Sequence, residues 1–130
     1  MLRIFNLLFF YFSLINKCSV SVPGPPSGVQ AIPVSKQTIR VLWDPPIEPN
    51  GIIRTYLLYY SKTVNDPLLT NSNKVTELKI IGNITSNYLP RLESDTEYFF
   101  WVKASTSVGV GNASTVVRQT TKDKSKCTSV

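Results

Sequence analysis

Acidic side chains are the groups in this 130-residue chain that come nearest to a chemical site. The sequence contains no histidine, so it has no imidazole base and no imidazole metal ligand. Its eight acidic residues are dispersed, and Glu93, Asp95 and Glu97 alternate so that they point to one face. Such a row can contact a cation, but a solvated corner beside Tyr98 is its ordinary role. The sequence therefore predicts no enzyme, no cofactor and no metal site.

Two glycine-bearing stretches, Asn50-Gly51 and Gly109-x-Gly111, superficially look like phosphate-binding loops. Neither opens a helix or carries the lysine that such a loop needs, so both are predicted to be turns. Two other motifs, which begin at Asn83 and Asn112, are acceptor sequences for N-linked glycosylation. Both lie in predicted turns or at loop edges that a transferase can reach. They are candidate glycosylation sites, with use of Asn83 favoured.

The elements that position these groups follow from the spacing of the large apolar residues. These residues alternate in three ladders: Ile39, Val41 and Trp43; Tyr56, Leu58 and Tyr60; Tyr98, Phe100, Val102 and Ala104. A period of two indicates strands with one face against a core. Turn residues divide the chain into seven predicted strands, at 29–31, 38–43, 53–61, 75–81, 86–89, 97–105 and 113–120. Pro33 is expected to end the first strand, and no window has a helical period. Seven short strands predict an all-β sandwich.

The amino-terminal segment is different in character. Residues 4–15 form a nearly continuous apolar run after the positive charge of Arg3, and Ser19-Val20-Ser21 is a small-x-small cleavage pattern. This order is typical of a secretory signal peptide. A membrane anchor is the alternative, but the run is shorter than the roughly 20 apolar residues that a bilayer core requires. We therefore expect residues 1–21 to be removed, leaving a secreted product without a membrane span.

The formal net charge of +6 belongs mostly to the ends of the chain. Without the signal segment and residues 122–130, the remainder carries about +2, too little for a nucleic-acid footprint. Residues 122–130 are predicted to be a basic, flexible tail, suited to weak electrostatic contact with anionic glycans. Cys18 and Cys127 lie outside the patterned region. Cleavage would leave Cys127 unpaired, whereas retention of Cys18 would require a bridge between the chain ends.

Several motifs occur together in a characteristic order and spacing: Pro25-Pro26, Trp43 followed by Pro45, Gly51-x-Ile53-x-x-Tyr56-x-Leu58-x-Tyr60, Leu92-x-Ser94-x-Thr96-x-Tyr98, Val102-x-Ala104, Gly109-x-Gly111 and Ser114. In this combination, residues 22–121 resemble a fibronectin type III domain. Immunoglobulin domains, the neighbouring class, need paired cysteines flanking the tryptophan, and this region has none. The chain departs from the family pattern at Ser94, where proline is usual, and at Thr106, where asparagine is frequent.

The resemblance implies an immunoglobulin-like, seven-stranded Greek-key β-sandwich. It places seven residues in the structural core: Trp43, Tyr56, Leu58, Tyr60, Leu92, Tyr98 and Val102. Trp43 would fill the centre of the sandwich. The segment from Leu92 to Tyr98 would form a tyrosine corner, with the phenol hydroxyl returning to the backbone upstream.

The complementary positions of two strands predict a candidate binding surface. If Tyr56, Leu58 and Tyr60 point inward, then Leu57 and Tyr59 point outward, and by the same alternation so do Phe99 and Trp101. In the resembled fold the two strands are neighbours, so Leu57, Tyr59, Phe99 and Trp101 would form an apolar patch with Thr55 and Lys103 at its margin. Exposed aromatic clusters mark interaction surfaces. The alternative is that Lys103, Arg54, the 62–74 loop or a sugar covers these rings.

The resemblance also implies a function. Members of the family act in cell adhesion, receptor ectodomains or extracellular matrix. We expect a non-catalytic, secreted glycoprotein module that binds extracellular or cell-surface proteins, without an Arg-Gly-Asp triplet for integrins. The alternative function is a structural spacer domain from a truncated or incomplete multidomain receptor.

Overall fold

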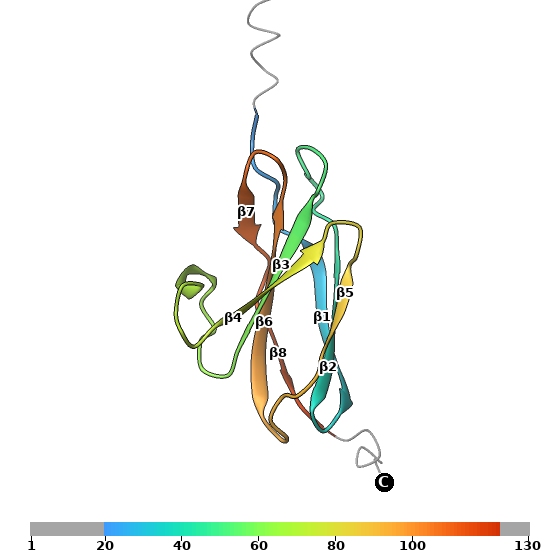
Figure 1. Cartoon of the computed structure of the whole chain (residues 1–130), viewed down its shortest axis with the longest axis vertical. Helices are drawn as coiled ribbons and strands as arrows, with labels where there is room; N and C mark the ends of the chain where they lie inside the picture. The colour runs from blue at the N-terminus through green and yellow to red at the C-terminus, as the bar shows by residue number, and fades with distance from the viewer. Residues whose placement is uncertain (1–19, 123–130) are drawn as a thin grey trace, which may run out of the picture.

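The computed structural model describes residues 20–122, which form a sandwich of two antiparallel sheets (Figure 1). The three-stranded sheet has the order β1 (Ser27–Ser35), β2 (Thr38–Asp44), β5 (Ser86–Leu89). The five-stranded sheet has the order β4 (Thr76–Ile81), β3 (Thr55–Ser61), β6 (Glu97–Ser105), β7 (Val110–Ala113), and β8 (Val117–Thr120) also pairs with β6. The predicted β-sandwich is therefore confirmed. The predicted signal segment, apart from residues 20 and 21, lies outside the described residues, as do both cysteines and the tail beyond Lys122.

Three local features differ from the sequence-based expectations. Strand β1 continues past Pro33 to Ser35, because an edge strand has one backbone side free of ladder hydrogen bonds and tolerates proline. In place of the predicted strand 113–120 there are two strands, β7 and β8, which both pair with β6 and are separated by residues 114–116. Strand β7 begins at Val110, so it includes Gly111 of the stretch predicted to be a turn. The loop after β3 contains a short 3-10 helix, η1 (Pro67–Leu69), in which Asp66 accepts a hydrogen bond from the Leu68 N–H at 2.9 Å.

The core between the sheets forms where the alternating ladders face each other. Trp43 of β2 meets Tyr56 of β3 edge-on, with ring centroids 5.5 Å apart and planes at 64°. Burial of such large rings is the main free-energy gain available to a domain without a described disulfide. Of the seven residues expected in the core, six are buried and Tyr60 is half-buried against them.

A tyrosine corner connects the two sheets. The Tyr98 hydroxyl accepts a hydrogen bond from the Glu93 N–H at 2.9 Å, and the neighbouring Leu92 N–H donates to the Gln37 carbonyl at 2.9 Å. At Ser94 the carbonyl accepts from the Thr96 hydroxyl at 2.9 Å. Side-chain and backbone hydrogen bonds thus close this turn in the absence of a proline.

The corner makes a prediction about stability. Replacement of Tyr98 by Phe keeps the buried ring but removes the acceptor of the Glu93 N–H, so the free energy of unfolding should fall by about 1–2 kcal/mol. Urea denaturation of the two proteins measures this difference. Tyr88→Phe is the matched control, because Tyr88 is exposed; equal losses in both variants would show that the corner hydrogen bond contributes nothing specific.

Candidate functional site

The four residues of the predicted patch lie together on the outer face of the five-stranded sheet. The register of β3 and β6 places Tyr59 opposite Trp101 and Ser61 opposite Phe99. The rings of Tyr59 and Trp101 are stacked, with centroids 5.8 Å apart and an interplanar angle of 11°. Leu57 lies one step along the same face, opposite Lys103.

These side chains do not form an open patch, and the structure agrees with the alternative expectation that the 62–74 loop covers the rings. Trp101 is 0%, Tyr59 4% and Leu57 7% exposed, and Phe99 packs against them half-buried. The cover consists of four further apolar side chains: Val64, Val75, Ala113 and Val116. Figure 1 shows the segment 62–75, here called the strap, on the side of the five-stranded sheet that faces away from the three-stranded one. The molecule therefore has a second hydrophobic core outside the sandwich.

One buried hydroxyl holds both ends of the strap. The Ser61 hydroxyl accepts hydrogen bonds from the N–H groups of Thr63 at 3.2 Å and Val64 at 3.0 Å. It donates to the Lys74 carbonyl at 2.7 Å. The start and the end of the strap are thereby joined at the last residue of β3, which positions the apolar cover over Tyr59 and Trp101.

The chemistry of the covered cluster is that of a structural core. Burial raises the pKa of the Tyr59 phenol, and its hydrogen bond to Glu77 raises it further. Lys103 Nζ lies 5.4 Å from the centroid of the same ring. The Trp101 indole nitrogen is buried without a hydrogen-bond partner within the described part of the chain. A protonated phenol and an unpaired indole offer neither a base nor a nucleophile.

The acidic row at the base of β6 is partly neutralised. Glu93 forms an ion pair with Lys62 of the strap, with Nζ and Oε1 2.6 Å apart, and this hydrogen bond raises the pKa of Lys62. Across residues 20–122 no group of three or more metal-ligating side chains is close enough to hold an ion. The row is better described as an exposed corner that anchors the strap.

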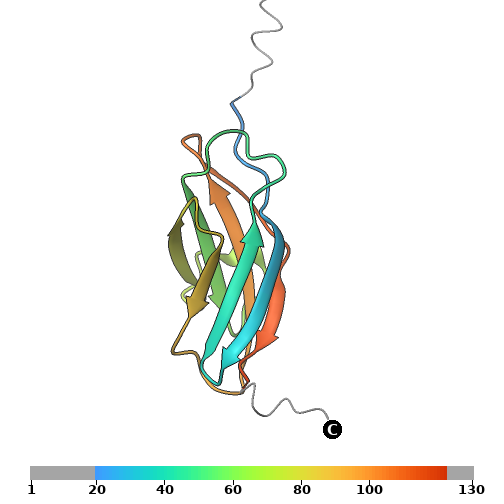
Figure 2. The same ribbon diagram turned by 90° about the vertical axis from the view of Figure 1, so that its right-hand side faces the viewer.

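The outer face of the three-stranded sheet is uncovered, and the sequence analysis did not single it out. Figure 2 looks onto β1 and β2, and no segment crosses in front of them. Tyr88 of β5 is 55% exposed, and the Arg40 guanidinium carbon lies 5.4 Å from the centroid of its ring. We call this surface the open face. Its members are Gln30, Ile32, Arg40, Leu42, Asp44, Ser86 and Tyr88.

The alternation along strands 38–43 and 86–89 could have indicated the open face, because it directs Arg40, Leu42 and Tyr88 outward. What the pattern could not show is which of the two sheets a loop would cover. That choice depends on where the strap lies in three dimensions.

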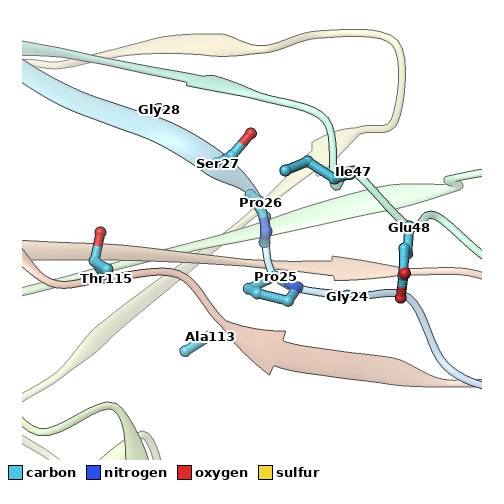
Figure 3. A pocket seen from close by; sticks show the side chains of 9 residues that line it. All are labelled: Gly24, Pro25, Pro26, Ser27, Gly28, Ile47, Glu48, Ala113 and Thr115. Atoms are coloured by element: carbon cyan, nitrogen blue, oxygen red, sulfur yellow. The ribbon is translucent and has the colours of Figure 1, made fainter.

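A groove of about 570 Å³ lies between residues 24–28, which lead into and begin β1, and the end of β7 (Figure 3). Its lining includes Pro25, Pro26, Ile47, Glu48 and Ala113. Among the lining residues Glu48 is the one ionisable side chain, so the groove holds no pair of groups for nucleophilic or acid–base catalysis. Its surface is suited to apolar contact.

The two glycosylation sequences differ in their surroundings. Asn83 is exposed in the turn between β4 and β5, and Asn112 is exposed within β7. The Ser114 hydroxyl, which completes the second sequence, is buried: it accepts from the Val102 N–H at 3.0 Å and donates to the Thr115 carbonyl at 3.0 Å. The second acceptor sequence is thus built into the sheet. In the region from residue 20 to residue 122, no helix has the length and apolar character needed to cross a membrane.

Comparison with known proteins supports the geometry. Residues 24–120 match the family model of the fibronectin type III domain. The chain is 35% identical to the human cell adhesion molecule DSCAM over 104 residues, which is 80% of this chain and 5% of that protein. It is 40% identical to the rat phosphatidylinositol phosphatase PTPRQ over 91 residues, which is 69% of this chain and 4% of that protein. The chain therefore spans about one twentieth of the length of these relatives.

Solved structures of fibronectin type III domains also match this chain. The FN5 domain of Drosophila Lar matches with a TM-score of 0.60 and 27% identity, covering 78% of this chain and 98% of that one. The third fibronectin III domain of the human KIAA0343 protein matches with a TM-score of 0.66 and 26% identity, covering 86% and 93%.

Because the aromatic residues of the covered cluster are buried, we expect their replacement to lower the stability of the fold. Trp101→Ala should lower the free energy of unfolding by about 3–5 kcal/mol, because it opens a cavity under the strap. Leu68→Ala, on the exposed side of η1, should change it by less than about 0.5 kcal/mol. Chemical denaturation of both variants measures the contrast. A Trp101→Ala protein as stable as the wild type would contradict the second core.

Proposed function

Because the chain belongs to the fibronectin type III family, we propose that it is an extracellular module that binds other proteins in cell adhesion or receptor-type recognition. Its relatives include cell adhesion molecules. The fibronectin type III fold, to which the chain belongs, is generally non-catalytic. The partners are extracellular or cell-surface proteins. Recognition would occur by surface complementarity without covalent chemistry.

The open face carries this proposal. A sheet face on which Ile32 and Tyr88 are exposed beside Arg40 combines apolar area, an aromatic ring and a cation. Tyrosine and arginine are enriched among the residues that dominate binding energy in protein interfaces. The covered cluster at Trp101 offers no such access while the strap lies over it.

We further propose the following organisation of the chain. Residues 1–21 direct secretion and are removed, 22–121 form the domain, and 122–130 form a basic tail that makes weak contact with anionic glycans. Asn83 carries an N-linked glycan, which adds polar bulk and solubility at the β4–β5 turn.

A spacer role is the second candidate, and one observation favours it. The described chain enters the sandwich at one end and leaves it at the opposite end (Figure 1). A domain with this layout can link neighbouring domains in a linear array, as part of a larger receptor.

The binding proposal is tested with the purified secreted protein applied to cells. Tyr88→Asp should lower its binding to cell surfaces at least about tenfold, since it replaces the exposed aromatic ring of the open face by a negative charge. The matched control is Leu68→Asp, which makes the same kind of change on the exposed side of the strap and should leave binding unchanged. Binding that both variants reduce equally would contradict the assignment of the open face, and a wild-type protein that binds no cell type would favour the spacer role.

Glycosylation is tested separately. Asn83→Gln should abolish the mass loss that the secreted protein shows on enzymatic removal of N-glycans. Asn112→Gln should leave it unchanged, because folding engages the Ser114 hydroxyl inside the sheet. Intact-protein mass spectrometry before and after treatment measures both. A mass loss that persists in Asn83→Gln would assign the glycan to Asn112.

A further inference from the structure

The charged residues of the three-stranded sheet have an unusually simple arrangement. Its three strands contain two of them, Arg40 and Asp44, and both belong to β2. Leu42 lies midway between them, and the alternation of the strand directs all three side chains to the outer face. Each charge is therefore about 7 Å along the strand from Leu42, in opposite directions.

Neither Arg40 nor Asp44 has an ion-pair partner within the described domain. Arg40 stacks on Tyr88, its Nε atom is buried without a hydrogen-bond partner, and no ion pair involves it among residues 20–122. Asp44 is exposed and also lacks an ion-pair partner in that range. The backbone of Gly28 leaves room for the Asp44 carboxylate, because a Cβ atom at Gly28 would lie 2.4 Å from Oδ2. A cation and a carboxylate thus stand free on either side of an apolar centre.

This arrangement is complementary to itself. We propose that the open face binds the open face of a second copy of this chain. The two copies are related by a two-fold axis that lies in the plane of contact between the two open faces and passes over Leu42 of each β2. The axis is perpendicular to the strands, so β2 of one copy runs antiparallel to β2 of the other. It places Arg40 of each copy opposite Asp44 of the other, and Leu42 against Leu42. The inference rests on the proposed binding function and names the partner.

The shape of the face agrees with its charge. A hollow of about 280 Å³ extends from Arg40 to Asp44 across the face, and most of its lining lies on the Asp44 side of Leu42. The lining consists of Gly28, Gln30, Arg40, Leu42, Trp43, Asp44, Thr85 and Ser86. Tyr88 is paired with Arg40 at the other end and projects from the sheet. The same two-fold rotation exchanges the two ends, which brings the ring of each copy over the hollow of the other. Isologous interfaces require this kind of self-complementarity.

The size of the face determines how strong the contact is. Three strands at about 4.8 Å spacing and about seven residues in length present on the order of 300–400 Å² per copy. This is less than half of the roughly 800 Å² per partner in a standard stable interface. The contact is therefore weak in solution and becomes effective where many copies are held together on a surface.

Charge reversal tests the proposal in solution. Sedimentation equilibrium of the secreted protein, before and after removal of N-glycans, should show a weak dimer whose association constant falls as salt rises from about 0.05 M to about 0.5 M. Arg40→Asp and Asp44→Arg should each weaken association at least about tenfold, since each places like charges opposite each other. The double variant R40D/D44R should restore it, and an equimolar mixture of the two single variants should associate although neither does so alone.

The controls separate this contact from other causes. Thermal unfolding of each variant verifies the fold, and Leu42→Lys, which puts two cations on the axis, is a further variant that should weaken association. The proposal is overturned if the wild type stays monomeric in both glycan states up to millimolar concentration. It is also overturned if the single and double charge variants associate equally. Either result leaves the binding of other proteins to be judged by the cell-surface assay.

Discussion

Strands β3 and β6 carry apolar side chains on both of their faces, and water must be excluded from both. The inner face meets the three-stranded sheet, where Tyr56 packs against Trp43. The outer face carries the Tyr59–Trp101 stack, which would expose two large rings if nothing lay over it. The strap and the β7–β8 connection cover this face. Val64 and Val75 of the strap and Val116 of the connection supply this cover.

Single hydroxyl groups hold in place, by hydrogen bonds to the backbone, the segments that border the two hydrophobic cores. Tyr98 receives the Glu93 N–H and so closes the corner between the sheets. Ser61 joins the two ends of the strap, and Ser114 fastens the connection between β7 and β8 to Val102. Each hydroxyl satisfies a backbone group at the margin of buried apolar surface, where an unpaired N–H or carbonyl would be costly. Polar groups in this domain therefore position its apolar cover.

The position of the strap also determines which sheet face a partner can reach. Once the strap covers the five-stranded sheet, the outer face of the three-stranded sheet is the sheet face that remains open to a partner. It combines an exposed tyrosine with an unpaired arginine and an unpaired carboxylate. These groups are suited to recognition by contact and charge, which fits a family whose members include cell adhesion molecules.

The sequence by itself determined the sandwich, because a period of two in three ladders admits few other folds. The resemblance of its motifs to the fibronectin type III family also implied a buried Trp43 and a corner hydroxyl at Tyr98, and the structure has both. The same periodicity correctly directed Tyr59 and Trp101 to the outer face of β3 and β6. It could not show that Val64 and Val75 would lie over them, because that contact joins a loop to strands distant in sequence and leaves no periodic signal. Only the tertiary structure decided which sheet face is covered, and with it that Arg40, Leu42 and Tyr88 face solvent together.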